Sequence, residues 1–112
     1  MRPIYKIVKR DAWEAAEAVG QFLGSPVDLA DGYIHFSEGD QLRETARKHY
    51  AGQDDLLLVT VDADRLDPPP VWEPSRGGAL FPHLYSPLPV AAAVEIRPLS
   101  VDAEASALVD FG

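Results

Sequence analysis

The spacing of apolar residues along the chain predicts two kinds of element. Short apolar or alternating runs bounded by Gly, Pro and Asp are typical of β-strands. They lie at residues 4–8, 33–37, 56–62, 71–73 and 93–97. The run at 56–62 is apolar at almost every position, which predicts a central strand covered on both faces.

A first helix is predicted at residues 12–19, where good helix formers predominate. Asp11 and Glu14 have the spacing of a capping box, which favours Asp11 as the N-cap. Gly20 can end this helix in a left-handed conformation. The Gly and Pro content of residues 21–30 then predicts a loop.

A second helix is expected from Ser37, as its N-cap, to about Tyr50, because apolar residues recur there at intervals of four. Three prolines make residues 82–89 a rigid loop in this interpretation. A short helix is expected within residues 100–111. The order of elements, two early helices among strands and then mostly strands, predicts an α+β fold. At 112 residues, with no linker, the chain is expected to form a single domain, 1–112.

Composition excludes several classes of protein. The net charge of −8 argues against coating of extended nucleic acid, which needs a basic surface. The absence of cysteine excludes disulfides and thiolate nucleophiles. No signal peptide or apolar span is visible, so we expect a cytoplasmic protein without a membrane partner. Basic residues near the N-terminus either form a local pocket for a small phosphate or are solvated surface charges.

Two histidines, His35 and His83, lie in short aromatic frames far apart in the sequence. Imidazole is the side chain best suited to proton transfer near neutral pH. Strand alternation places Tyr33, His35 and Ser37 on one polar face, opposite two apolar residues. We therefore expect both histidines to line one polar cleft. The alternative for each is a structural histidine that packs and bonds within the fold.

Five further residues complete the candidate site. Glu73 follows a tryptophan, where a carboxylate acts as an acid or base or else forms a surface salt bridge. Arg76 precedes two glycines and either grips a phosphate or belongs to an ordinary turn. Lys6 either reaches water or points into a ligand cleft. Tyr5 and Tyr85 are either core aromatics or contacts for a bound ligand.

The segments DGYIHFS (31–37) and FPHLY (81–85) are the most specific in the chain. Together with IYKI (4–7), Trp13 and Trp72-Glu73, they resemble the bacterial family known as domain of unknown function 952. The resemblance covers residues 4–97 and leaves 98–112 as a tail. The family in turn resembles the ADP-ribosyltransferase superfamily. That likeness implies a mixed, mainly antiparallel sheet with two early helices and a cleft for NAD or an ADP-ribose-like group.

The same resemblance implies roles for individual residues. In the superfamily the cleft is lined by the first strand, a second strand and a late strand. Carried over, these positions are Tyr5 and Lys6, then His35 and Ser37, then Glu73 or His83.

Three hypotheses follow. The first is a small enzyme that binds NAD, ADP-ribose or a related phosphorylated nucleoside. Its expected contacts are His35 on a ribose hydroxyl, Lys6 or Arg76 on phosphate, Tyr85 on a ring, and Glu73 or His83 on the reacting bond. The second is a non-catalytic ligand-binding or interaction module on the same fold. The third is a metal-dependent hydrolase, but the separated ligands are a weak signal, so no metal is expected. The oligomeric state is left open.

Overall fold

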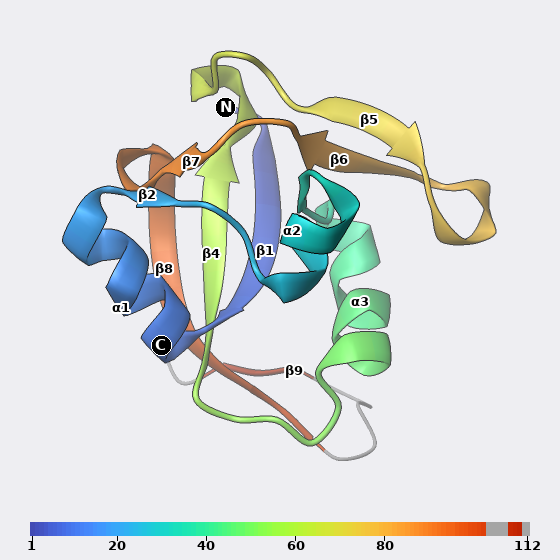
Figure 1. The fold of residues 1–112 in the computed structure, drawn as a ribbon. Coiled ribbons are helices and arrows are strands. Elements are labelled where there is room, and N and C mark those ends of the chain that lie inside the picture. The colour runs from blue at the N-terminus through green and yellow to red at the C-terminus, as the bar shows by residue number, and fades with distance from the viewer. Residues whose placement is uncertain (103–107, 111–112) are drawn as a thin grey trace.

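A four-stranded antiparallel sheet of order β1-β4-β8-β9 forms the centre of the fold (Figure 1). Its strands are β1 (Pro3–Lys9), β4 (Leu56–Asp62), β8 (Ala93–Val101) and β9 (Leu108–Asp110). The computed structural model describes residues 1–102 and 108–110. The register places Ile4 opposite Val61 in β1 and β4, and Val59 opposite Ile96 in β4 and β8.

β4 lies between β1 and β8 and is covered on both faces, as its apolar pattern predicts. Leu57 and Val59 face a large core, to which α1 (Arg10–Val19) contributes Trp13. Leu56 and Leu58 face a smaller core beneath α3 (Leu42–His49). The sheet therefore separates two apolar layers, and the hydrophobic effect on both sides holds β4 in place.

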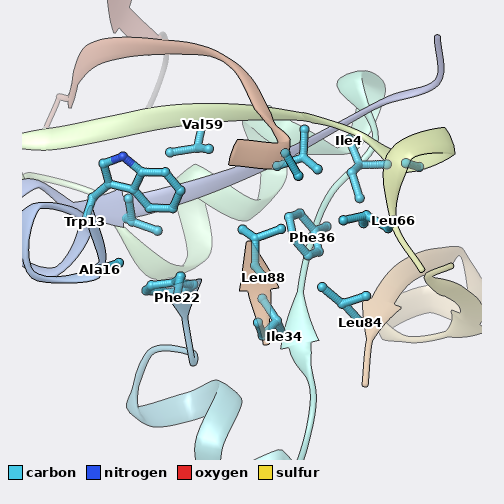
Figure 2. Close-up of a cluster of buried hydrophobic side chains, with 14 of the residues drawn as sticks. Ile4, Trp13, Ala16, Phe22, Ile34, Phe36, Val59, Leu66, Leu84 and Leu88 are labelled. Atoms are coloured by element: carbon cyan, nitrogen blue, oxygen red, sulfur yellow. The ribbon is translucent and has the colours of Figure 1, made fainter. Parts of the chain in front are cut away.

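The larger core draws on segments far apart in the chain. Figure 2 shows Trp13, Phe22 and Leu88 gathered beside Val59. The rings of Trp13 and Phe22 lie 5.9 Å apart between centroids. Aromatic side chains bury about 150–250 Å² each. At about 25 cal/mol per Å², each such ring contributes on the order of 4–6 kcal/mol before the entropy of ordering it.

Two smaller sheets complete the β-structure. β2 (Gln21–Phe22) pairs with β7 (Leu88–Pro89), and β3 (Ile34–His35), β6 (Leu80–Leu84) and β5 (Val71–Pro74) form a sheet of order β3-β6-β5. The three-stranded sheet joins the main one through two backbone bonds between Tyr5 and Ser37, each of 2.8 Å. This junction brings the polar edge of β3 beside β1.

The remaining elements are short. α2 (Pro26–Asp31) lies between β2 and β3, and single 3-10 turns occupy Gly39–Gln41, Ala63–Arg65, Arg76–Gly78 and Val90–Ala92. None of the helices in residues 1–102 combines the length and apolar character needed to cross a membrane. The α+β class and the mainly antiparallel pairing agree with the sequence-based prediction.

The predicted loop at 21–30 is wrong, because this segment contains β2 and α2. Pro26 stands at the start of α2, where its missing N–H costs nothing. The carboxylate of Asp28 accepts the N–H of Ser25 at 2.8 Å and so caps the helix. Gly32 then ends the helix with φ of 88°.

Two predicted helix caps are also wrong. α1 begins at Arg10, whose N–H bonds to the carbonyl of Asp55 at 3.1 Å, so Asp11 lies inside the helix. Gly20 ends it as predicted, with φ of 91°. The Ser37 hydroxyl bonds to Thr45 Oγ1 at 2.9 Å, and a 3-10 turn precedes α3.

The rigid loop predicted at 82–89 begins as a strand instead. β6 includes Pro82 and His83, and the Pro82 carbonyl accepts the N–H of Phe36 at 3.0 Å. Of the helix predicted within 100–111, residues 108–110 form β9, and 103–107 and 111 lie outside the described residues. The strand conformation of β9 depends on its pairing with β8, and the local sequence does not predict such pairing.

Candidate functional site

His35 and His83 face each other across a strand pair. They are register partners in β3 and β6, and their rings meet edge to face with centroids 5.5 Å apart. Tyr33 stacks on His83 at 4.1 Å and contacts His35 at 4.6 Å. Tyr85, beyond the end of β6, lies 5.1 Å from Tyr33. These four rings, Tyr33, His35, His83 and Tyr85, form the histidine–tyrosine cluster.

Glu73 joins the cluster from β5. Its Oε1 accepts hydrogen bonds from the Tyr85 hydroxyl and from Nδ1 of His83, each of 2.7 Å. The bonds from Tyr85 and His83 lower the pKa of Glu73, and the Glu73 bond raises the pKa of Tyr85 to about 12. A carboxylate that holds the Nδ1 proton leaves Nε2 as the basic nitrogen of a neutral imidazole. Glu73, His83 and Tyr85 therefore form a connected hydrogen-bonded triad.

A buried carboxylate supports the other half of the cluster. Asp28 is 2% exposed and accepts from Nδ1 of His35 at 2.6 Å, from the His35 N–H at 3.1 Å and from the Ser25 N–H at 2.8 Å. Lys6 Nζ lies 3.1 Å from its Oδ2 and donates to the His35 carbonyl at 2.8 Å. Asp28 thus links α2, β1 and β3 through one side chain.

Burial has opposite effects on the two members of this ion pair. Burial by itself raises the pKa of Asp28, but the bond from His35, the charge of Lys6 and the backbone N–H groups outweigh it. The pKa of that carboxyl therefore lies well below its usual range. Burial lowers the pKa of Lys6, and the attraction of Asp28 offsets this only in part. The close contact between Lys6 and Asp28 stabilises both charges at a buried position, where either charge without the other would be unfavourable.

His35 is enclosed by carboxylates on both ring nitrogens. Besides the Asp28 contact at Nδ1, its Nε2 lies 3.0 Å from Oδ2 of Asp31. Carboxylates only accept hydrogen bonds, so both contacts are made together when the ring carries both protons. In that state His35 has no free lone pair and cannot act as a general base. His83 keeps a lone pair on Nε2, although its ring is only 3% exposed, and His35 has a supporting role.

The structure places the predicted site residues in two groups. His35, His83, Glu73 and Tyr85 come together, and Lys6 lies beneath them through Asp28. Tyr5 and Ser37 stand apart. Tyr5 packs against the core beneath α3, and the Ser37 hydroxyl bonds to Thr45 of that helix.

Arg76 lies in the 3-10 turn between β5 and β6, and its side chain is outside the described part of the structure.

Two residues of the site, Asp28 and Asp31, were not predicted from the sequence. Asp28 lies in the segment interpreted as a loop, although its spacing from Ser25 is that of a helix cap. Asp31 lies four residues before His35, outside the strand that carries the histidine. Their contacts depend on how α2 packs against β1 and β3, which no local pattern reports.

The cluster presents an aromatic surface at the side of the molecule. Its rings contact one another closely, and Tyr85 is the most exposed, at 53%. Two open hollows, of about 360 and 500 Å³, lie around Asp54 and Asp55 and include no member of the cluster. Within the described residues, no three His, Asp or Glu side chains are placed to hold a metal ion.

Comparison with known proteins identifies a close structural relative. The crystal structure of protein CC0527 from Caulobacter crescentus matches with a TM-score of 0.87 and 51% sequence identity, covering 92% of this chain and 90% of that chain. Its solution NMR structure matches with a TM-score of 0.81 and 51% identity, over 94% and 90%. No curated protein matches. A family model described as "Protein of unknown function (DUF952)" matches residues 7–96. The chain therefore belongs to the DUF952 family.

Proposed function

We propose that this protein is a small cytoplasmic enzyme that binds NAD, ADP-ribose or a related phosphorylated nucleoside at the histidine–tyrosine cluster. The observation that carries the proposal is the triad in which Glu73 Oε1 holds both His83 Nδ1 and the Tyr85 hydroxyl at 2.7 Å. A histidine oriented by a carboxylate is a common arrangement for a general base. The resemblance to the ADP-ribosyltransferase superfamily that was expected from the sequence is the reason for naming these ligands.

The proposed roles follow the contacts of each residue. Nε2 of His83 takes or gives the proton, and Glu73 orients the ring and stabilises positive charge on it. Tyr85, which is half exposed, offers its ring to a base or a ribose. Lys6 is bound to Asp28 and supports the cluster from below, so it is unavailable for phosphate.

A non-catalytic ligand-binding module is the second candidate. The enclosure of His35 by Asp28 and Asp31 favours it, because those contacts use both ring nitrogens for structure. The same surface would then recognise a ligand without turning it over. The two candidates differ in whether the bound ligand is converted to product.

The experiment is a titration of 15N-labelled protein with NAD and with ADP-ribose to millimolar concentration, followed by analysis of the NAD for cleavage. We expect shifts at His35, His83 and Tyr85. We also expect His83→Asn and Glu73→Gln to reduce turnover by about 10²–10⁴-fold, the usual contribution of a general acid or base. His49→Asn, an exposed histidine of α3, is the matched control.

Each outcome has a definite meaning. Binding with turnover that depends on His83 supports the enzyme. Binding without turnover, unchanged in both variants, supports the module. Absence of shifts at millimolar NAD and ADP-ribose rejects both candidates.

A further inference from the structure

We propose that the group recognised at the histidine–tyrosine cluster is a positively charged nitrogen, as in a pyridinium or an alkylated ammonium. The inference rests on the proposed function, since it concerns the same surface and names the part of the ligand that docks there. It follows from the arrangement of carboxylates around exposed aromatic rings.

Two carboxylates flank the Tyr33 ring from different elements. Asp31, at the end of α2, reaches His35, which contacts Tyr33 at 4.6 Å. Glu73, in β5, bonds to Tyr85, which contacts Tyr33 at 5.1 Å. Burial raises the pKa of Tyr33, and the negative charges of Asp31 and Glu73 raise it further.

These groups are accessible to a ligand. Tyr85 is 53% exposed, Asp31 47% and Glu73 35%. Both hydrogen bonds at Glu73 use Oε1, so Oε2 is the oxygen that can meet a ligand. A cation on this surface would meet the negative face of the exposed Tyr85 ring and the Glu73 carboxylate, and the charge of Asp31 would add to the attraction.

The basic groups nearby are already neutralised. Lys6 is 7% exposed and bound to Asp28, and His35 is enclosed between Asp28 and Asp31. Among the described side chains of the site, three carboxylates, Asp28, Asp31 and Glu73, therefore face one lysine and one histidine. A surface with this excess of negative charge attracts cations and repels phosphate. The phosphates of a nucleotide would then lie away from the cluster.

The test compares ligands that differ in charge and little else. 15N-labelled protein is titrated with 1-methylnicotinamide, a cation, and with nicotinamide, which has the same ring without the charge. Tetramethylammonium chloride is the third probe and separates an ammonium from a pyridinium. We expect the cations to shift the signals of Tyr33 and Tyr85, with 1-methylnicotinamide binding about tenfold more tightly than nicotinamide.

Variants locate the charge that is responsible. Glu73→Gln and Asp31→Asn should each reduce the preference for the cation, and together they should abolish it. Glu14→Gln removes the same charge from an exposed position on α1 and should leave the preference unchanged.

The proposal is overturned if nicotinamide binds as tightly as its methylated cation, or if the preference survives in the double variant. It is also overturned if no probe shifts the cluster. Equal binding of NAD and ADP-ribose, which lacks the pyridinium, would leave the proposed function standing while rejecting this inference. If the cations bind and neither nucleotide binds, this inference stands and the proposed function is rejected.

Discussion

At the scale of single residues, the site depends most on Asp28. Its carboxylate is buried and joins Lys6, His35 and the backbone of Ser25. Lys6 is almost as buried, so removing its counter-charge leaves a cation in the core. Breaking one side of such a pair costs far more than the pair contributes, because the remaining charge stays desolvated.

We therefore predict that Asp28→Asn lowers the free energy of unfolding by about 3–5 kcal/mol. Asparagine keeps one oxygen for the Ser25 N–H, but its NH₂ group cannot accept the bonds that His35 and Lys6 donate to Oδ1, so the change removes these bonds as well as the charge. Chemical denaturation of the purified variant measures the effect. Asp64→Asn is the matched control, since Asp64 is exposed and should change stability by about 0.5 kcal/mol or less.

A double-mutant cycle measures the coupling between the two charges. Lys6→Met combined with Asp28→Asn removes both charges and should be more stable than the sum of the single effects by about 1–3 kcal/mol.

The folded pKa of Asp28 lies below its unfolded value. Its stabilisation is thus complete above about pH 4 and is lost as pH falls further. The role given to Asp28 is contradicted if the single effects are additive. It is also contradicted if Asp28→Asn loses as much stability at low pH as the unmodified protein does.

The meeting of His35 and His83 could be predicted from the sequence, whereas their supports could not. Each histidine has tyrosine nearby in its own segment, and strand alternation indicates which side chains share a face. Asp28 becomes a ligand for His35 and Lys6 only when α2 packs against β1 and β3. Tyr5 and Ser37 show the opposite case. Their backbones pair with each other beside the site, but their side chains lie on the α3 side.

At the scale of elements, the segment before β3 is where the sequence was hardest to interpret. Gly24, Pro26 and Asp28 are all common in loops, yet here Pro26 starts α2 and Asp28 caps it. The helix has only six residues, too few for an apolar periodicity. Its position depends on the turn that precedes it, where Gly24 has φ of 126°.

Two glycines that flank α2 provide a matched comparison. Gly24 and Gly32 both have positive φ, but a Cβ on Gly24 would lie 2.8 Å from the Cβ of Asp28, whereas a Cβ on Gly32 would meet nothing within 4 Å. We predict a loss of about 1–2 kcal/mol for Gly32→Ala from the backbone alone. Gly24→Ala should lose a further 1–3 kcal/mol or so from the clash.

Thermal and chemical denaturation measure both variants, and NMR spectra give a second readout. Gly24→Ala should move the His35 signals, because Asp28 must shift, while Gly32→Ala should leave them nearly in place. Equal losses in the two variants would show that the contact with Asp28 relaxes freely and does not position α2.

At the scale of the whole molecule, the class of fold was predictable and its division into three sheets was not. The double-sided apolar pattern of β4 indicates a central strand, and it lies in the middle of the main sheet. β2 and β7 are two residues long, so only their pairing with each other defines them as strands. Pro82, Pro87 and Pro89 indicated a loop, but Pro82 lies in β6, whose strand conformation comes from β3 and β5 on either side.

In the β5–β6 hairpin, which carries Glu73 and His83, β6 pairs with β3, and β5 is held in place by further contacts of Trp72. Its Nε1 donates to Glu38 Oε2 at 2.7 Å, and the Arg2 guanidinium lies 3.9 Å from its ring centroid. In Figure 1 this hairpin projects from the side of the main sheet. The partly buried Trp72 side chain packs against the larger core. Local opening of such an element is expected before global unfolding.

We predict that Trp72→Phe lowers the hydrogen-exchange protection of β5 and β6 amides by about tenfold, the equivalent of one lost hydrogen bond to a charged group. Amides of β4 should keep most of their protection, because they exchange through global unfolding. Trp13→Phe is the contrasting variant, since Trp13 Nε1 is the one fully buried side-chain donor without a partner in the described residues. It should weaken the whole core through the cavity it leaves and not the hairpin selectively. Uniform loss of protection across β4 and β6 in Trp72→Phe would show that the hairpin opens only with the whole domain, so that the triad is as rigid as the main sheet.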